Sequence, residues 1–441
     1  MRTVRGLEAA RELLLAGRGL DFDTVPAHVA QRTAEVFGER LSPLETVVRI
    51  IREVRSEGDS ALRRLTKAFE GCDLDTFEVP RQTWPDAYNH ISDELVEALK
   101  LAAERIRRFH EASMPQGWFD STEGYGELVI SVGTVGCYVP GGTAPLISTL
   151  LMTAVPARVA GVEEVFVASP ARPDGSVPPG ILVAADIAGV DRVFLIGGAQ
   201  AIAAMAYGTE SVPKVDLVCG PGNVFVTLAK KLVFGDVGVD GLFGPTETVL
   251  IADEMANPTL CAADLLAQAE HDVLATPVLI TTSEQLAADV VKEVGVRVER
   301  LERRAIAGES IDSRGVVAIV DNVDKAIDLA NEFAPEHMCL MVRDPSRYTD
   351  RVRNAGVVFQ GELSHEVLGD YVAGPSHVMP TGGTARFGSG VGVRTFLKFT
   401  PVVGLDRPMS ASLTKAASTI GRAEGLTGHA EAAEIREELL P

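Results

Sequence analysis

The spacing of apolar residues predicts a mainly helical first quarter of the chain. Between Pro43 and about Ser113, apolar side chains recur at intervals of three and four, for example at Val47, Ile50, Ile51 and Val54. This spacing places them on one face of successive helices. The chain before this region, up to about Pro26, is expected to be helical first and loose afterwards.

Beyond this region, short apolar runs rich in β-branched residues alternate with helical stretches. Strands that alternate with helices predict parallel sheets covered by helices on both faces. The runs are too numerous for one small sheet, so we expect an α/β fold with two Rossmann-like parallel-sheet lobes. The predicted strands are residues 132–139, 165–168, 193–196, 217–219, 248–252, 277–281, 316–320, 339–342 and 357–359.

The last fifty residues show little strand signal beyond Val402 and Val403. The alanine- and glutamate-rich stretch 410–440 predicts a helical tail, which either caps its own chain or reaches a neighbouring one. The expected division of the chain is an N-terminal helical segment, two α/β lobes and this tail. The corresponding ranges are 1–24 for the segment, 25–136 with 248–390 for the first lobe, 137–247 for the second lobe and 391–441 for the tail.

Composition narrows the classes of partner. The formal net charge of -20 disfavours binding to nucleic acid or to anionic membranes. No apolar run approaches the roughly 20 residues that a membrane helix needs. The N-terminus lacks the apolar core of a secretion signal. The five cysteines are scattered without a Cys-x-x-Cys pair, which predicts reduced thiols in a cytoplasmic protein and disfavours a cysteine-built zinc site.

Four glycine-rich loops follow predicted strands, at residues 139–143, 196–200, 219–223 and 243–247. In open α/β sheets, ligands bind at the carboxyl ends of strands, where glycine lets the backbone approach a phosphate. None of the loops matches the Gly-x-Gly-x-x-Gly or P-loop pattern, and each alone is typical of a structural turn. Because three of them fall within about eighty residues, they favour a nucleotide-binding crevice together.

Gln268 and His271 lie near the end of a predicted helix that begins at Asn257 and Pro258. Residues three apart share a helix face, so both side chains could bind one metal ion. The alternative is a polar helix end with an exposed histidine.

Pro335 is expected to stop a helix and to leave Glu336 and His337 on the loop that enters the next strand. A carboxylate beside an imidazole suits general acid–base catalysis near neutral pH, although such pairs are also common on surfaces. Downstream, Asp370 offers a hard oxygen ligand and His377 a polar contact, both in a loop rich in glycine and proline. A helix break at Gly425 would put Glu424 and His429 on one bend, where both could point into a cleft.

Taken together, these motifs resemble histidinol dehydrogenases from about residue 30 to residue 436. The motifs are Tyr138-Val139-Pro140-Gly141-Gly142, Gly197-Gly198-Ala199-Gln200-Ala201-Ile202, Gly220-Pro221-Gly222-Asn223, Gln268-Ala269-Glu270-His271, Ala334-Pro335-Glu336-His337, Gly369-Asp370-Tyr371, His377-Val378-Met379-Pro380-Thr381, and Glu424-Gly425-Leu426 followed by His429. They occur in the same order as in that family, which makes the signal much stronger than that of any single loop.

The resemblance implies a site residue by residue. Its zinc ligands would be Gln268, His271, Asp370 and His429, with one zinc ion per subunit. Contacts to NAD would come from Tyr138, Gln200 and Asn223, and proton transfer from Glu336 and His337. The substrate would be surrounded by Thr246, Gln268, His271, His337, Asp370, His377, Glu424 and His429.

The resemblance also implies the reaction, a zinc-dependent, NAD-linked, four-electron oxidation of L-histidinol through L-histidinaldehyde to L-histidine. These would be the last steps of histidine biosynthesis. His337 would act as a base in both oxidations, and Glu336 would activate water for the second. The family's homodimers imply that the C-terminal tail of one chain completes the site of the other.

Three positions differ from the family pattern. Thr246 stands where serine is usual, Ser376 replaces the usual asparagine beside His377, and residues 386–393 are glycine-rich where Ser-Pro-Leu is expected. None of these differences removes an implied ligand or catalytic residue.

Two other functions are compatible with parts of the pattern. A related enzyme could oxidise another primary alcohol, such as a sulfonated propanediol, but no added arginine or lysine for a sulfonate is evident among the substrate-side motifs. Glu424 and His377 favour an amino-imidazole substrate. An inactive zinc- or nucleotide-binding protein would be expected to lack a ligand or the Glu336–His337 pair, and both are present.

Overall fold

The structure is a computed structural model that describes residues 1–20, 22, 25, 27–141 and 146–439. It divides into two compact units. The core unit comprises Met1–Ser113 and Val132–Phe396, and the tail unit comprises Met114–Ser131 and the chain from Leu397 onward. Each unit is described by itself below.

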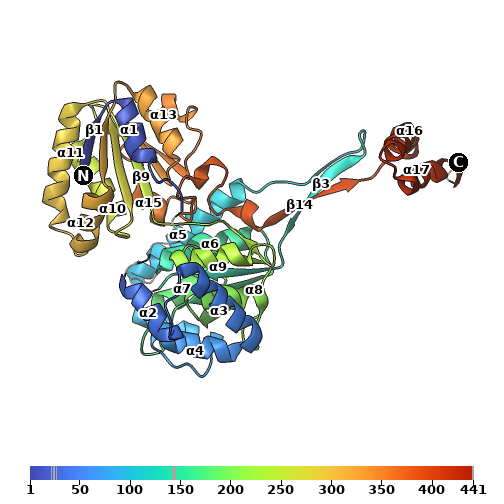
Figure 1. Cartoon of the computed structure of the whole chain (residues 1–441), viewed down its shortest axis with the longest axis horizontal. Coiled ribbons are helices and arrows are strands. Elements are labelled where there is room, and N and C mark those ends of the chain that lie inside the picture. The colour runs from blue at the N-terminus through green and yellow to red at the C-terminus, as the bar shows by residue number, and fades with distance from the viewer. Residues whose placement is uncertain (21, 23–24, 26, 142–145, 440–441) are drawn as a thin grey trace. The chain divides into compact units, whose positions relative to one another are not determined.

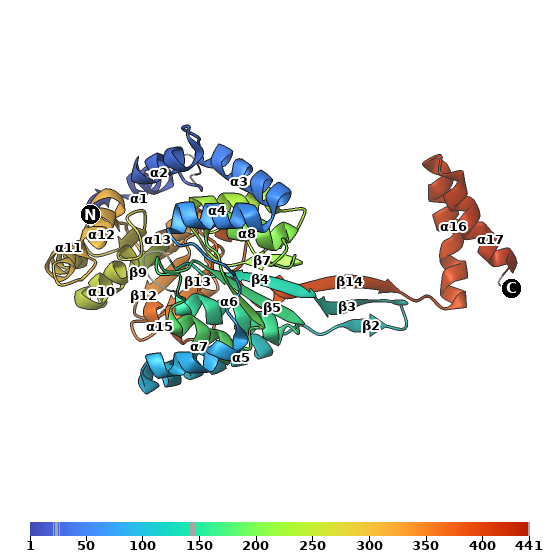
Figure 2. The same ribbon diagram turned by 90° about the horizontal axis from the view of Figure 1, so that it is seen from below.

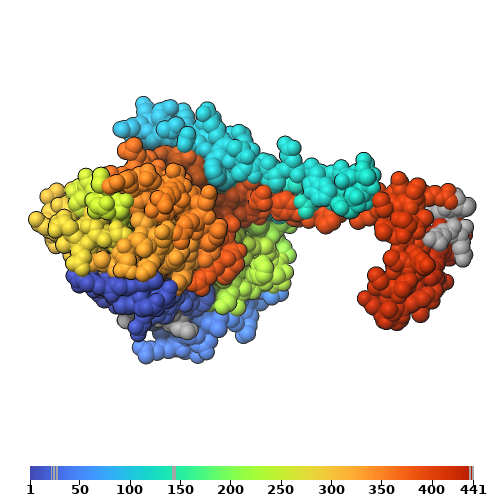
Figure 3. Space-filling view, turned by 90° about the horizontal axis from the view of Figure 1, so that it is seen from above, coloured from blue at the N-terminus to red at the C-terminus, as the bar shows by residue number. Residues whose placement is uncertain are grey.

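The core unit contains a parallel six-stranded sheet in the order β1-β11-β10-β9-β12-β13. Helices α1 and α13 cover one face of this sheet, and α10, α11 and α12 cover the other (Figure 1). Figure 3 shows the N-terminal residues in dark blue directly against the orange segment that includes α13. The bounds are β1 Arg2–Arg5, β9 Glu247–Ala252, β10 Thr276–Thr281, β11 Val316–Ile319, β12 His337–Met341, β13 Val357–Gln360, α1 Leu7–Leu15, α10 Pro258–Ala269, α11 Glu284–Val298, α12 Arg304–Arg314 and α13 Val323–Phe333.

A second parallel sheet in the core unit has five strands in the order β6-β5-β4-β7-β8. Helices α6 and α7, with α5 outside them, cover one face; α8 and α9, with α3 and α4, cover the other (Figure 2). The bounds are β4 Thr134–Tyr138, β5 Glu164–Ser169, β6 Arg192–Leu195, β7 Leu217–Cys219, β8 Gly238–Val239, α2 Ala27–Phe37, α3 Pro43–Glu57, α4 Asp59–Glu70, α5 Asp93–Ala112, α6 Ile147–Val159, α7 Pro179–Ala188, α8 Gly198–Tyr207 and α9 Val224–Val233.

Shorter elements connect these layers. They are the 3₁₀ helices η1 Arg81–His90, η2 Thr384–Arg386 and η3 Val393–Phe396, and the short helices α14 Ser346–Thr349 and α15 Glu366–Tyr371.

Burial on both faces explains why the central strands appear in the sequence as continuous apolar runs. Every residue of β9 and β12 is buried, and the helices on each side form separate apolar clusters with them. A parallel strand that is covered by helices has no polar face, so it shows no alternation. All nine predicted strands are present, and the expected α/β fold with two parallel-sheet lobes is confirmed.

The expected division of the chain differs from the structure in two respects. Residues 2–5, expected to be helical, form β1 at the edge of the six-stranded sheet. Helices α3, α4 and α5 pack on the five-stranded lobe and not on the first lobe. The reason is that the apolar face of α3, with Val47, Ile50 and Val54, is buried against α8 and α9. The boundary expected at residue 24 falls outside the described residues.

The tail unit combines an antiparallel three-stranded sheet with a helix pair. Its strands are β2 Trp118–Asp120, β3 Tyr125–Ser131 and β14 Leu397–Val403, and its helices are α16 Arg407–Ala423 and α17 Thr427–Leu439. The helical tail is therefore confirmed, but it begins later than residue 391 and is preceded by a strand. Strand β14 gave little signal because most of its side chains are exposed, so its sequence shows neither an apolar run nor a buried face.

Within the described residues, none of the helices combines the length and apolarity needed to cross a membrane. All five cysteines are buried and unpaired.

Candidate active site

Glu336 and His337 lie where helix α13 gives way to strand β12. The helix ends at Phe333, and Ala334 then adopts φ 54°, the only positive φ of a non-glycine residue in the described part of the chain. His337 is the first residue of β12, which pairs with β9 on one side and β13 on the other. As expected, the two side chains lie at the entry to a strand. The pairing of β12 with β9 and β13 and the turn at Ala334 fix the backbone there.

The imidazole of His337 lies between two carboxylates. Its Nδ1 is 3.7 Å from Glu336 Oε2, and its Nε2 is 3.7 Å from Asp370 Oδ1. The ring stacks on Phe359 and is buried, with no hydrogen bond from either nitrogen to a described residue. Burial alone would lower the pKa of His337, but the surrounding carboxylates, Glu336 first, raise it to about 10.

The carboxyl group of Glu336 is buried as well, and its Oε2 accepts a hydrogen bond from the backbone N–H of Glu247 at 3.2 Å. Burial raises the pKa of Glu336 to about 7, although the charge of His337 and a contact with Thr246 oppose the increase. A carboxyl group that titrates near neutrality can exchange protons at physiological pH.

The expected metal-side residues converge next to this pair. Thr246 Oγ1 donates to Gln268 Oε1 at 2.9 Å, and Gln268 Nε2 donates to Asp370 Oδ2 at 3.2 Å. Asp370 comes close to His337 because Gly369 has no side chain; a Cβ there would lie 2.5 Å from the Phe359 ring. Burial would raise the pKa of Asp370, but His337 and further histidines lower it, so this carboxyl group is ionised.

His271 lies two residues beyond the end of helix α10 at Ala269, so, contrary to the expectation, it does not share a helix face with Gln268, whereas the N-terminus of the helix is capped by Asn257 as expected. Its side chain is reached by solvent, yet the protein packed around it lowers its pKa, while Asp370 opposes this decrease. Gln268, His271 and Asp370 therefore supply an amide oxygen, an imidazole and an ionised carboxylate, a mixed N/O set that fits a divalent cation such as zinc. In the described part of the chain, no three His, Cys, Asp or Glu side chains form a ready metal cluster.

His377 lies beside the same carboxylate. Its Nδ1 is 2.7 Å from the carbonyl oxygen of Asp370, and its Nε2 is 3.0 Å from Thr149 Oγ1 on helix α6. The neighbouring Ser376 donates to the carbonyl of Met152 on the same helix at 2.9 Å. The His377 segment thus joins the six-stranded lobe to α6, and a substrate contact by His377 would replace one of these two ring contacts.

Two of the three expected nucleotide contacts meet at the carboxyl ends of β4 and β6. The hydroxyl of Tyr138 accepts from the N–H of Gly198 at 3.1 Å, and Gln200 Nε2 donates to Glu70 at 3.1 Å. Glu70 also accepts from the N–H groups of Gly197 at 2.9 Å and Ala171 at 3.1 Å. Gly142 and Thr143 of the first glycine-rich loop lie outside the described residues.

Asn223, the third expected contact, caps helix α9 by accepting from the N–H groups of Phe225 and Val226. The preceding loop turns at Gly220, whose φ of 111° and whose approach to the Tyr138 carbonyl exclude a side chain, because a Cβ would lie 2.1 Å from that oxygen. This end of the sheet therefore presents backbone and amide groups in fixed positions.

Glu424 and His429 belong to the tail unit. Both side chains are exposed at the turn between α16 and α17, where Gly425 has φ 75°. They lie on one bend, as expected, and the residues described above all belong to the core unit.

The chain was compared with known protein families, curated proteins and solved structures. The model of the histidinol dehydrogenase family matches residues 38–437. The chain belongs to the histidinol dehydrogenase family. It is 49% identical over 440 residues to histidinol dehydrogenase of Deinococcus radiodurans, which covers 99% of this chain and 100% of the relative. It is 50% identical over 397 residues to that of Thermus thermophilus, which covers 89% and 94%.

Among solved structures, histidinol dehydrogenase from Elizabethkingia anophelis superposes with a TM-score of 0.91 at 32% identity and covers 100% of this chain and 98% of that one. The fold of this member of the histidinol dehydrogenase family is thus the family's fold over its whole length.

Two carboxylates near the histidinol dehydrogenase motifs, the buried Glu366 and the half-buried Glu70, were not predicted from the sequence. Glu366 on α15 accepts from Thr248 Oγ1 and from Cys339 Sγ, and burial raises its pKa to about 7. It precedes Asp370 by four residues, and this helical spacing could have placed it on the same face. Glu70 had no such signal, because it is the last residue of an ordinary amphipathic helix and its partners lie more than 100 residues away.

Proposed function

We propose that the chain oxidises L-histidinol to L-histidine in two NAD-linked steps at a zinc site. In the first step, RCH₂OH and NAD⁺ give RCHO, NADH and H⁺. In the second, RCHO, H₂O and NAD⁺ give RCOO⁻, NADH and two H⁺. The observation that carries the proposal is the buried His337 between Glu336 and Asp370, beside Gln268, in a chain that belongs to the histidinol dehydrogenase family.

The residues proposed to hold zinc are Gln268, His271 and Asp370 from the core unit and His429 from a tail unit. When bound, zinc orients and polarises the substrate without redox chemistry, and NAD, contacted by Tyr138, Gln200 and Asn223, accepts the hydride. The ionised Asp370 and the amide of Gln268 favour a cation at this position. Thr246 orients that amide, since its hydroxyl donates to the Gln268 oxygen.

His337 is proposed as the base that takes the hydroxyl proton of the alcohol and, later, of the hydrated aldehyde. This role needs a neutral imidazole, whereas the neighbouring carboxylates raise its pKa to about 10. A cation held by Asp370 would weaken the effect of that carboxylate on His337 and would lower the pKa of His337. The stacking of the ring on Phe359 keeps Nε2 directed to the Asp370 side.

Glu336 is proposed to activate the water that adds to the aldehyde. Burial raises its pKa to about 7, so this carboxyl group can take up and release a proton near neutral pH, as the role requires. The N–H of Glu247 fixes one carboxyl oxygen and leaves the other for this transfer. Because the site is buried, it also limits escape of the reactive aldehyde.

Glu424, His429 and His377 are proposed to bind the substrate's amino-imidazole part, with Glu424 and His429 supplied by the partner of a homodimer. The tail unit supports this proposal because its sheet leaves large apolar side chains exposed, which is typical of an interaction surface. They include Trp118, Phe119, Tyr125, Leu128, Ile130 and Val403. We also propose a cytoplasmic location, which the five unpaired, buried thiols support.

The test is to count NADH formed per L-histidinol consumed by the purified, zinc-loaded protein. Two NADH per substrate, lost after chelation and in His337→Ala, are expected. One NADH with accumulation of aldehyde would remove the second step from the proposal. If the zinc-bound protein does not turn over L-histidinol, the proposed substrate becomes another primary alcohol. A sulfonated propanediol would be tested first.

A further inference from the structure

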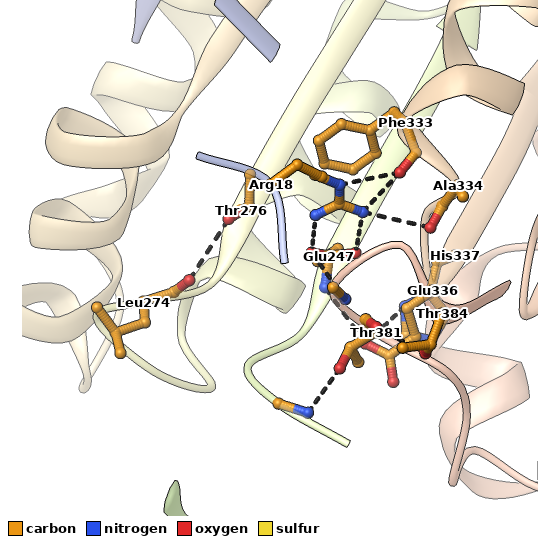
Figure 4. Close-up of polar contacts among 12 residues, drawn as sticks. Arg18, Glu247, Leu274, Thr276, Phe333, Ala334, Glu336, His337, Thr381 and Thr384 are labelled. Carbon is orange, nitrogen blue, oxygen red and sulfur yellow. Dashed lines mark hydrogen bonds and ion pairs between the residues drawn. The ribbon is translucent and has the colours of Figure 1, made fainter. Parts of the chain in front are cut away.

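The Glu336–His337 segment is attached to a residue far upstream in the chain. Figure 4 shows the guanidinium group of Arg18 between the carboxylate of Glu247 and the carbonyls of Phe333 and Ala334. Arg18 lies outside the range matched by the family model, which starts at residue 38. None of the motifs in the sequence includes it.

The hydrogen bonds that the Arg18 side chain donates go to the backbone just before Glu336 and to the side chain of Glu247. Nε and Nη2 donate to the Phe333 carbonyl at 2.9 and 2.7 Å, Nη2 donates to the Ala334 carbonyl at 3.2 Å, and both Nη atoms donate to the Glu247 carboxylate. The guanidinium carbon also lies 3.6 Å from the centre of the Phe333 ring. Arg18 thus caps the end of helix α13 just before the catalytic pair, and its planar fork fits these acceptors in a way that an ammonium group cannot.

The backbone that Arg18 caps is strained. Ala334 has a left-handed conformation with φ 54° and ψ 66°, which brings the Cβ of a non-glycine residue too close to the following carbonyl oxygen. Such a conformation persists only where the surroundings impose it, and it is often found next to functional residues. The carbonyls of Pro335 and Glu336 accept from Gly356 and Val357, so the following residues are fixed from the other side.

Glu247 carries the effect of Arg18 to the reacting carboxyl group. Its backbone N–H donates to Glu336 Oε2, and its side chain, which is 7% exposed, accepts from Arg18 and from the N–H of Gly382. Without Arg18, a buried negative charge would remain beside Glu336. Glu247 would then have to protonate or move, and either change would displace its N–H from the Glu336 carboxyl group.

We infer that Arg18, acting through Glu247 and the end of α13, is a positioning residue that sets the orientation of Glu336 and His337. The inference rests on the proposed function for its kinetic consequences. The structural prediction is independent of the proposed function. Loss of Arg18 should release the left-handed turn at Ala334 whatever the substrate is.

The kinetic test measures alcohol and aldehyde oxidation separately in Arg18→Met. Misplacement of a reacting group by about 1 Å costs on the order of 10²-fold in rate. Since Glu336 acts only in the second step, kcat for L-histidinaldehyde should fall about 100-fold and kcat for L-histidinol about tenfold, while KM for NAD stays close to wild type. Arg18→Lys should oxidise the aldehyde little faster than Arg18→Met does. Ethylguanidinium added to Arg18→Ala should restore part of the rate of aldehyde oxidation.

Arg192 provides a matched control. It also forms a two-pronged pair with a carboxylate, Glu78, donates to a backbone carbonyl, Ser211, and lies over an aromatic ring, Phe194. It is located at the start of β6, on the five-stranded sheet. Arg192→Met should lower thermal stability as Arg18→Met does, but should leave the ratio of aldehyde to alcohol oxidation unchanged. An equal loss of both steps in Arg18→Met, without rescue by ethylguanidinium, would reduce Arg18 to a structural residue.

A crystal structure of Arg18→Met or Arg18→Lys tests the inference without catalysis. A changed φ at Ala334 and a Glu336 carboxyl group away from the Glu247 N–H would support it, and an unchanged segment would overturn it. If the wild-type protein oxidises neither compound, the proposed function fails, and this structural result still decides the role of Arg18.

Discussion

The two parallel sheets carry different kinds of groups at opposite ends of their strands, the six-stranded sheet at the amino ends of β9 and β12 and the five-stranded sheet at the carboxyl ends of β4, β6 and β7. At the six-stranded sheet, ionisable side chains gather around His337, and the pKa values of Glu336 and Glu366 are raised to about 7. At the five-stranded sheet, carboxylates bind backbone N–H groups of the glycine-rich loops: Glu70 those of Gly197 and Ala171, and Asp240 that of Gly220. The first lobe has its charges where a reaction would occur, and the second uses them to fix loop shape.

The ion pair in the second lobe illustrates this contrast. Lys230 and Asp240 are buried and 2.5 Å apart, and they bind the carbonyl and the N–H of Gly220, each at 2.8 Å. Both charges are satisfied within the protein, so neither is available for chemistry. In the first lobe, both ring nitrogens of His337 and one oxygen of Glu366 have no hydrogen-bond partner in the described chain. Both ring nitrogens of His110 on α5, beside the five-stranded sheet, also have no partner in the described chain, so the two lobes differ in the clustering of ionisable groups around His337 and not in unsatisfied atoms alone.

The largest expected effect comes from the first lobe. His337→Ala should lower kcat for both oxidation steps about 10²- to 10⁴-fold, the usual contribution of a general base. NAD binding, measured by protein fluorescence, should be retained because Tyr138, Gln200 and Asn223 are untouched. If kcat and NAD affinity fell by comparable factors, catalysis and NAD binding would not depend on different lobes.

Asp370→Asn should separate metal binding from nucleotide binding. An amide removes the negative charge that the Gln268–Asp370–His271 set offers a cation, so zinc affinity should fall more than the roughly 10- to 100-fold typical of residues that only support a ligand. Zinc competition with a chelator measures this. Activity should return partly at excess zinc, and unchanged zinc affinity would remove Asp370 from the ligand set.

Gly220→Ala should affect only the nucleotide side. The new Cβ would meet the Tyr138 carbonyl at 2.1 Å and would adopt φ 111°, so the loop must shift. Strain of roughly 1–3 kcal/mol corresponds to an increase in KM for NAD of about 10- to 100-fold, with zinc content unchanged. Gly235→Ala is the control, because Gly235 has φ 107° with no atom within 4 Å of the added Cβ. An equal effect in both variants would exclude the contact with Tyr138 as the cause.

Glu70→Gln should give the smallest effect, seen in the pH dependence of stability. Burial raises the pKa of Glu70 from 4.5 to about 7, although contacts from Gly197, Ala171 and Gln200 oppose it. The folded protein therefore keeps this proton where the unfolded chain has lost it. The associated stability is present below pH 4.5 and is lost as the pH rises to about 7, by on the order of 1–2 kcal/mol.

Urea unfolding of wild type and Glu70→Gln at pH 5 and pH 7.5 measures that loss. The difference in unfolding free energy between the two pH values should be smaller in the variant, because glutamine does not titrate. Identical differences would mean that the Glu70 carboxyl group titrates as it does in the unfolded chain.

The parallel sheets were predictable because strands buried on both faces are largely apolar, and residues 249–252 of β9 are an example. Helix ends were predictable where a local contact defines them, as Asn257 does for α10 and Pro335 does after α13. Strand β14 was not predictable. It pairs with β3 through its backbone, but most of its side chains remain exposed, so its sequence has no apolar pattern.

The candidate site was predictable as far as its residues form local motifs. The approach of His337 to Asp370 depends on Gly369 next to Phe359, a contact between segments about ten residues apart that no motif reveals. Arg18 and Glu70 act on loops far away in the sequence. Arg18 lies in the turn after α1 and Glu70 at the end of α4, and neither belongs to a recognisable motif. Long-range contacts of single charged residues therefore could not be predicted from one sequence.

The edge strand β1 affects the time course of synthesis. Its four residues leave the ribosome well before their partner β11, which follows about 310 residues later. At roughly 5–20 residues per second this delay is about 15 to 60 s. The five-stranded sheet, which ends at Val239, can form during that interval, while β1, α1 and Arg18 wait for the strands and the helix they contact. A pause or truncation before residue 316 would thus leave a chain with a complete five-stranded sheet and an unpaired β1.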